Sequence, residues 1–299
     1  MDAFLTSRPV ADILGGLTNG VIYSLVALSL VLIWRSTRIL NFAQGAMAML
    51  AAYVGFAILA PTTNYWISMG VAVVAGIVLG GLTERTIVRA LYGKPEINPV
   101  VAMVGFLLVL ESVAAAIWST VSRSLPTPFS IVDWQLRGRP VAMSPFALYE
   151  VVTAVVVMVV IAVVFQFTRV GLQLRAAALN PEVSRLLGVR VHRMLTVGWM
   201  LASGVGAITA VLVASNYFTG LTPTTMDGVF AFGFIAAAIG GLDSPVGALV
   251  SGVALGIAFQ FVGDYLNSNA IILVALGLLI VSLMVRPNGV FTRRAQRRV

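Results

Sequence analysis

The chain has 299 residues, of which 59% are hydrophobic and only 10% are charged, and its mean hydropathy is +0.99. Soluble domains carry about a quarter charged residues, so this composition excludes an ordinary soluble protein and predicts an integral membrane protein. The net charge of +8 could indicate nucleic-acid binding, but the basic residues lie between apolar runs, where membrane topology already accounts for them, so we expect no nucleic-acid partner.

Nine apolar runs follow one another along the chain, and a run needs roughly 20 residues to cross a bilayer. They lie at residues 13–34, 44–60, 66–82, 98–119, 147–167, 195–218, 229–242, 247–264 and 268–285. We therefore predict an all-α polytopic membrane protein with eight to ten transmembrane helices in a single transmembrane domain, residues 1–299. The first run is too long for a signal-peptide core, so it predicts a retained helix.

The basic residues are distributed unequally between the two sides that these runs define. If every run crosses, the strings 35–43, 83–97, 168–194 and 286–299 share one side with residues 243–246. That side carries all of the 19 Lys and Arg residues except Arg8, Arg123, Arg137 and Arg139. Because cytoplasmic loops are enriched in Lys and Arg, we predict a cytoplasmic C-terminus and an external N-terminus.

Asn41 and Gln44 are three residues apart, which puts two amides on one helical face where the second run begins. Amides buried in a bilayer must find partners. The pair could line a polar path or could join two helices, and joining is the interpretation we prefer.

Glu111 is the only ionisable residue in the middle of an apolar run, where an ionised carboxylate is costly. It is therefore a functional candidate, and the alternative is a protonated or hydrogen-bonded core glutamate. Asp227 lies at the end of a run, where we expect it to reach water. A carrier driven by protons or sodium should place several ionisable groups at mid-membrane, and only Glu111 qualifies.

The string from Thr168 to Arg193 holds five arginines and the only histidine of the chain. Within it, Asn180 can cap a helix, Pro181 suits the first helical position, and Gly188 can end the helix in a left-handed conformation. Glu182 complements the helix dipole. This pattern predicts a short helix of about two turns. Its apolar side could enter a groove on another protein or could rest on the lipid surface; that side consists of Val183, Leu186 and Leu187.

Glycines interrupt several runs. The run 229–242 is short and contains Gly233 and Gly240, so it could form a broken or re-entrant helix. The run that begins at Asn98 could likewise start as a short half-helix. Small residues four apart predict close helix packing; the pairs are Gly16 and Gly20, Gly76 and Gly80, and Gly252 and Gly256.

Several catalytic and binding patterns are missing from the sequence. It has no G-x-x-x-x-G-K-[ST] nucleotide-binding loop, no H-E-x-x-H pair and no cysteine. His192 is the single histidine and lies in a polar string, so it cannot serve a serine within the membrane. We expect no catalytic site, no metal site and no cofactor in this chain. Any energy for transport should come from another subunit.

Four strings in this order and at this spacing carry a specific resemblance: LNFAQGAMAML, GLQLRAAALNPEVSRLLGVRV, AFGFIAAAIGGLDSPVGALVSG and VRPNGVF. They resemble the permease subunits of branched-chain amino acid ABC importers of the Liv type, over nearly the whole chain. The resemblance implies a permease in the cell inner membrane, surrounded by lipid, beside a second related permease. It also implies two cytoplasmic ABC ATPase subunits that use the ATP, and a periplasmic substrate-binding protein.

The resemblance also assigns residues. The ATPase-coupling segment of the family matches the loop 168–194, at Gly171, Arg175, Ala176, Asn180, Pro181, Glu182, Leu187 and Gly188, and Leu186 joins them on the apolar side of the short helix. The conserved turn of the family matches Gly240 and Gly241, with Asp243 where a small residue is common. We expect the translocation path to involve Asn41, Gln44, Glu111, Gly240 and Gly241.

The resulting expectation is a pore-forming permease subunit of an ATP-driven importer for branched-chain or related small amino acids. It would be energised through the cytoplasmic helix that follows Asn180. One alternative is an ABC permease for urea or short amides, because relatives of similar sequence are thought to move such solutes. A different class of alternative is an ion-coupled secondary transporter that uses Glu111.

Overall fold

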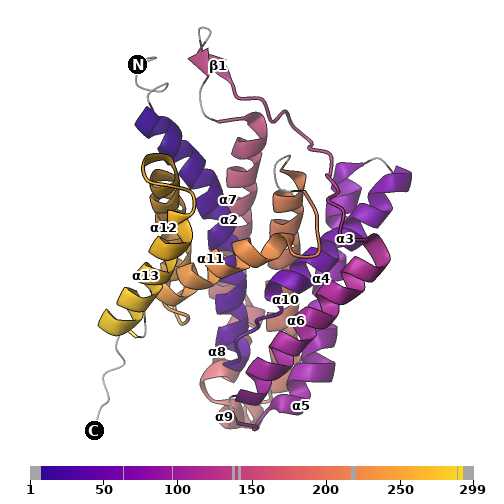
Figure 1. Ribbon diagram of the computed structural model, residues 1–299. Coiled ribbons are helices and arrows are strands. Elements are labelled where there is room, and N and C mark those ends of the chain that lie inside the picture. The colour runs from indigo at the N-terminus through magenta and orange to yellow at the C-terminus, as the bar shows by residue number, and fades with distance from the viewer. Residues whose placement is uncertain are drawn as a thin grey trace.

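The protein is a bundle of long helices, shown in Figure 1 as a computed structural model that describes residues 8–62, 64–95, 97–136, 139–140, 143–216, 220–287 and 289–291. Each of the nine predicted runs forms a helix. In chain order these are α2 (Arg8–Thr37), α3 (Gln44–Thr62), α4 (Tyr65–Thr83), α6 (Ile97–Trp118), α7 (Pro145–Phe167), α10 (Val191–Ser215), α11 (Thr225–Gly240), α12 (Pro245–Tyr265) and α13 (Ala270–Val285). The prediction of an all-α membrane fold is confirmed.

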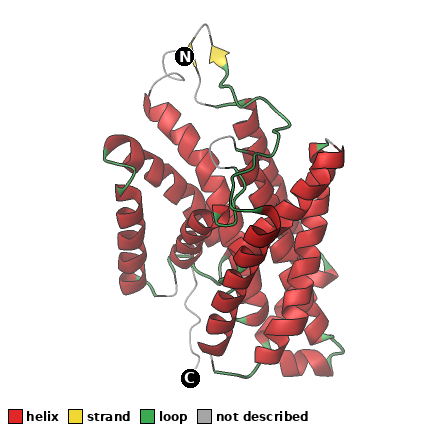
Figure 2. Ribbon diagram, turned by 45° about the vertical axis from the view of Figure 1, so that its right-hand side comes forward, coloured by secondary structure: helices red, strands yellow, loops and turns green. Residues whose placement is uncertain are grey.

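Shorter elements connect the long helices. A π-helix, η1 (Glu84–Val88), and α5 (Arg89–Leu91) extend α4, while α8 (Arg169–Leu179) and α9 (Pro181–Leu186) lie between α7 and α10. The strands in the described part form one small antiparallel hairpin, β1 (Gln135–Leu136) with β2 (Arg139–Pro140), drawn in yellow near the top of Figure 2. Helix and loop therefore account for nearly everything that positions a site.

Polar residues mark where several long helices begin. The Asn64 side chain accepts from the Trp66 and Ile67 amides at the start of α4, and Ser144 and Ser244 each accept from the third following amide at the starts of α7 and α12. Such side chains satisfy amide groups that lack a partner in the first helical turn. The apolar runs thus start at sites that the sequence itself specifies.

Among the described residues, six helices are long and apolar enough to span a membrane, and α3, α11 and α13 are shorter apolar helices. Helix α11 is continuous from Thr225 to Gly240 and lies crosswise to α2 (Figure 1). Helix α6 is also continuous from Ile97, so the expected half-helix start is not observed. Pro99 lies in the first turn of α6, where a missing N–H costs little.

Helices α2 and α10 form the centre of the bundle. Inside the most apolar 18-residue window, 78% of the residues are buried in each of these helices, against 17% in α6 and α7. The outer helices therefore present most of their surface away from the chain. Glycines let the inner ones approach closely: a Cβ placed on Gly256 of α12 would lie 2.2 Å from the Cα of Gly20 in α2. The predicted close packing is confirmed.

Contacts join several of the polar strings that are expected to share one side. Arg38, after α2, pairs with Asp243, and the ring of Tyr92, after α5, stacks over His192 in α10. We call this the α9 end, the end of the bundle that carries α5, α8 and α9 (Figure 1). The predicted basic tail from Arg293 to Arg298 lies outside the described residues, as does Arg137.

Candidate functional site

Helix α9 is built by the cap residues that the sequence predicts. The Asn180 side chain accepts from the Val183 amide at 3.1 Å, and Pro181 occupies the first helical position. At the other end, Gly188 has a φ of +81°, and its amide donates to the Arg185 carbonyl at 3.0 Å. The next amide reaches back to the Ser184 carbonyl at 2.9 Å, which completes a Schellman motif. A six-residue helix is thereby fixed at both ends.

The apolar side of α9 faces away from the bundle. Leu186 is 87% exposed and Leu187 is 77% exposed, and Val183 is exposed as well. Glu182 is exposed in the first turn, whereas Ser184 is buried against the chain. The described part of the chain thus leaves a rigid apolar ridge uncovered at the α9 end.

The remaining residues of the predicted coupling segment lie on α8 and face inward. Gly171 is buried where α8 turns back on α7, and a Cβ there would come within 2.3 Å of the Val164 carbonyl oxygen. Arg175 and Ala176 are half-buried, and the Arg175 Nε donates to the Gly171 carbonyl at 3.4 Å. The structure therefore divides the predicted segment into an inward part on α8 and an outward part on α9.

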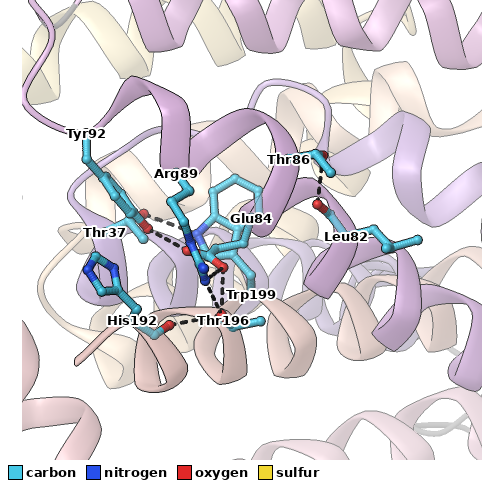
Figure 3. A network of polar contacts seen from close by, with 9 residues as sticks. All are labelled: Thr37, Leu82, Glu84, Thr86, Arg89, Tyr92, His192, Thr196 and Trp199. Atoms are coloured by element: carbon cyan, nitrogen blue, oxygen red, sulfur yellow. Dashed lines mark hydrogen bonds and ion pairs between the residues drawn. The ribbon is translucent and has the colours of Figure 1, made fainter. Parts of the chain in front are cut away.

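A polar network that sequence reasoning missed joins the start of α10 to the extension of α4 (Figure 3). Glu84 is fully buried and accepts from Arg89 at 3.0 Å, from the Tyr92 hydroxyl at 3.1 Å and from the Thr196 hydroxyl at 2.6 Å. Both carboxylate oxygens are thus used by donors from the same chain. Because α10 follows α9 directly, this network fixes the base of the α9 ridge.

Tyr92 is suited to its place in the network. Burial and the neighbouring Glu84 carboxylate raise the pKa of the Tyr92 phenol, so it stays protonated and can donate. The sequence contains a signal for this network. No helix breaker occurs between Thr83 and Gly93, so the helix of α4 can continue and turn Glu84 inward. The polar composition of the string 83–97 instead suggests a connection along its whole length.

Asn41 and Gln44 join two helices, which is the interpretation that the sequence favours. Both side chains are buried, and the Asn41 Nδ2 donates to the Gln44 Oε1 at 3.0 Å. Gln44 then donates from Nε2 to the Ala202 carbonyl of α10 at 3.1 Å. The two amides are therefore engaged in holding α3 against α10.

Glu111 has a second carboxyl group beside it, which the sequence analysis did not anticipate. Its carboxyl group interacts electrostatically with that of Asp227, in the first turn of α11, and its Oε1 is buried without a hydrogen bond among the described residues. The expectation that Asp227 stands alone near water was incomplete, because α11 lies crosswise and brings its first turn to α6. No group of three or more His, Asp or Glu residues in the described part could hold a metal ion.

Gly240 is the last residue of α11, and Gly241 begins the turn that leads to α12. Both are buried, and the segment after α13 packs on them: the Val290 amide donates to the Ile239 carbonyl at 2.9 Å. A Cβ on Gly289 would lie 2.2 Å from the Gly241 Cα. Among the described residues, no hydrogen bond joins these glycines to Asn41, Gln44 or Glu111, and their place in a translocation path stays a prediction.

Comparison with known proteins gives one consistent relationship. A family described as "Branched-chain amino acid transport system / permease component" matches residues 12–284. The permease protein BraD of the high-affinity branched-chain amino acid transport system of Pseudomonas aeruginosa is 26% identical, over 94% of this chain and 95% of that protein. The corresponding protein LivH of Escherichia coli is 25% identical, over 93% of this chain and 94% of that protein.

Two further similarities are more distant. A xylose/arabinose import permease protein, XylH of Sulfolobus acidocaldarius, is 26% identical over 67% of this chain and 51% of that protein. Among solved structures, PsaBC from Streptococcus pneumoniae in complex with Fab aligns over 96% of this chain and 95% of that chain, with 13% identity and a TM-score of 0.48. Since the family match covers most of the chain and BraD and LivH align over nearly their full length, the chain belongs to the permease component family of branched-chain amino acid transport systems.

Proposed function

We propose that this chain forms the pore of an ATP-driven importer for branched-chain or related small amino acids, and that α9 transmits the work of the ATPase to it. Members of the family are transport permease components and not enzymes. The observation that carries the coupling proposal is the α9 ridge: a helix capped at both ends that exposes Leu186 and Leu187 to the outside. A rigid apolar ridge suits a groove on another subunit better than it suits water.

The proposed assembly follows from this role. A second related permease would complete the pore, two cytoplasmic ABC ATPase subunits would receive the α9 ridge, and a periplasmic binding protein would deliver the amino acid. The coupling surface would comprise Asn180, Pro181, Glu182, Leu186, Leu187 and Gly188, supported from α8 by Gly171, Arg175 and Ala176. The chain would lie in the inner membrane with the α9 end in the cytoplasm.

The decisive experiment replaces Leu186 by aspartate. Because a charged group in an apolar groove is costly, Leu186→Asp should weaken capture of the purified ATPase by roughly tenfold or more and should reduce ATP-dependent uptake in membrane vesicles. Leu266→Asp is a matched control, since Leu266 is 71% exposed but follows α12 beside Asp264 and Arg8, away from α9. The control should insert, bind the ATPase and transport normally. Normal capture and uptake for Leu186→Asp would rule out α9 as the coupling element.

The proposed orientation has its own test. A reporter that is active only in the cytosol, fused after Val299, should be active, because this choice puts most of the arginines inside. Activity of a periplasmic reporter at the same position would mean that one crossing is assigned wrongly. The short crosswise helix α11 would then be the first segment to re-examine.

An ion-coupled carrier remains a second candidate because of one observation, the contact between Glu111 and Asp227. Two adjacent carboxyl groups could pass a proton from one to the other, whereas a lone glutamate has no second group to receive it. The two candidates differ in their energy source. Uptake in vesicles that depends on ATP and the added ATPase, and survives a protonophore, supports the ATP-driven importer; uptake that a protonophore abolishes without ATP supports the carrier.

The substrate is proposed from the family as a whole. The names of BraD and LivH state branched-chain amino acid transport, and we extend that class to this chain. Competition by unlabelled leucine, isoleucine and valine against labelled leucine uptake should be strong, whereas urea and acetamide should not compete. Competition by urea or acetamide alone would favour the amide permease.

A further inference from the structure

A cavity of about 250 Å³ lies at the α9 end, where the last turn of α2 meets α8 and the turn between α11 and α12. Three arginines line it: Arg35 and Arg38 from the end of α2, and Arg175 from α8. Asp243 is the one acidic residue among the described residues that line the cavity. We call it the arginine cavity, and three guanidinium groups against one carboxylate leave it with surplus positive charge.

The ion pairs and hydrogen bonds inside the cavity show which arginines carry the surplus positive charge. Arg38 forms an ion pair with Asp243, which uses the carboxylate. Arg35 lies over the ring of Phe165 at 6.0 Å from the centroid. Asp243 attracts it electrostatically, but its guanidinium makes no direct ion pair or hydrogen bond with a described residue. Arg175 donates only from Nε, to a carbonyl, so its terminal nitrogens also lack a partner among the described residues. Two guanidinium forks are therefore available.

We propose that the arginine cavity binds a phosphate group, supplied by the headgroup of an anionic phospholipid or by free phosphate. Guanidinium forks bind phosphate oxygens in pairs, and Arg35 and Arg175 reach the cavity from two different helices. The apolar residues Leu32, Phe165 and Leu174 line the same cavity, which suits the glycerol and first methylenes of a lipid. A phosphate held between both forks would tie α8 to the central helix α2.

The cavity also lies at the level where lipid phosphates are found. Helix α2 has 30 residues, so it is about 45 Å long and exceeds a hydrocarbon core of about 30 Å. Arg35 is in the last turn of α2 and Phe165 in the last turn of α7, so both lie near the membrane boundary at this end. Basic pockets between helices at this level are suited to anionic headgroups.

The test measures ligand-dependent thermal stability of the purified full-length chain in a neutral detergent at fixed ionic strength. Three probes are titrated: short-chain phosphatidylglycerol, short-chain phosphatidylcholine and inorganic phosphate. Phosphatidylglycerol should raise the unfolding midpoint of the wild type with saturation, because it binds only the folded chain. Phosphatidylcholine should have little effect. A saturable shift with inorganic phosphate as well would identify free phosphate as a second source.

The variants assign the effect to the cavity. Arg35→Gln and Arg175→Gln each remove a charge-assisted contact, so half-saturation should need roughly ten- to a hundredfold more phosphatidylglycerol. Arg169→Gln is the matched control, because Arg169 is exposed on the same helix as Arg175 and does not line the cavity. It should titrate like the wild type. If Arg35→Gln does not fold, Arg175→Gln on the outer helix α8 gives the same measurement.

A variant that strengthens binding separates this site from general damage. Asp243→Asn removes the only competing carboxylate and frees Arg38, so it should lower the half-saturating lipid concentration. Asp133→Asn makes the same change of charge in the exposed loop before β1, outside the cavity, and should leave the half-saturating lipid concentration unchanged. Titrations of Arg35→Gln and Arg175→Gln that superimpose on the wild type would overturn the proposal. An equal response to phosphatidylcholine in all variants would also overturn it.

Discussion

Two charged clusters at the α9 end differ in how their charges are matched. Around Glu84, three donors converge on one buried carboxylate, and both of its oxygens are used; the donors are Arg89 in α5, Tyr92 after α5 and Thr196 in α10. In the arginine cavity, three guanidinium groups face one partly exposed carboxylate, and two of them, Arg35 and Arg175, form no direct ion pair with a described carboxylate. The first cluster is complete within the chain, and the second is complete only with an added anion.

The same contrast separates the other candidate residues. Asn41 and Gln44 satisfy each other and a carbonyl of α10, so they act as a joint between helices. The α9 ridge, in contrast, has apolar side chains that the described part of the chain does not cover. A group whose interactions are satisfied internally should show its effect in stability, whereas an unsatisfied one should show it in binding or transport. The following predictions test that division.

The largest effect is expected at Glu84. Glu84→Ala leaves Tyr92 without its acceptor and Arg89 without its ion-pair partner, whereas the Thr196 hydroxyl keeps the His192 carbonyl at 2.9 Å. Breaking a buried pair costs about 3–5 kcal/mol. Arg89 is 40% exposed and can turn to water, so a loss of about 3 kcal/mol in the free energy of unfolding is expected. Denaturant unfolding of the purified chain measures it. Thr86→Ala, on the same π-helix but exposed, should cost less than about 0.5 kcal/mol, and equal losses would contradict the interpretation.

A smaller loss is expected at Gln44. Gln44→Leu removes the donor to the Ala202 carbonyl and the acceptor for Asn41, and interhelical hydrogen bonds in membranes are worth about 0.6–1.7 kcal/mol. Unfolding should become easier by about 1–2 kcal/mol, because two such contacts are lost. Gln166→Leu, at an exposed position of α7, serves as the control and should be neutral. An unchanged Gln44→Leu would return these amides to the translocation path.

The fold was predictable because its signals are local. Runs of apolar residues, polar caps such as Ser144 and close pairs such as Gly16 and Gly20 act over a few neighbouring residues. The α9 helix was predictable for the same reason, since Asn180 and Gly188 suffice to define it. The two charged clusters were not predictable from the sequence. Glu84 contacts Thr196, which is 112 positions away in the chain, and Arg35 and Arg175 line the same cavity only because α8 folds back on α7. The periodicity of apolar residues and the helix-capping residues contain no information about such long-range contacts.

The third prediction concerns the cap of α9. Asn180→Ala removes the acceptor of the Val183 amide and should cost about 1 kcal/mol, but only locally, because α9 is exposed. Amide hydrogen exchange within α9 should therefore accelerate about fivefold while the unfolding midpoint of the chain stays constant. Asn269→Ala is a matched control, since Asn269 precedes α13 without a side-chain cap bond. Unchanged exchange in Asn180→Ala would mean that other contacts hold α9.

The smallest effect is expected at Glu111, and it bears on the energy source. Glutamine keeps the size and the hydrogen-bonding groups of the side chain beside Asp227 and removes only the ability to take up and release a proton. If ATP hydrolysis in other subunits drives transport through α9, Glu111→Gln should keep ATP-dependent uptake within a few-fold of the wild type, and Asp227→Asn should behave alike. Both effects would be far below that of Leu186→Asp. Complete loss of uptake in Glu111→Gln, with normal insertion and normal capture of the ATPase, would instead place the carboxyl pair in the energy-coupling step and would favour the ion-coupled carrier.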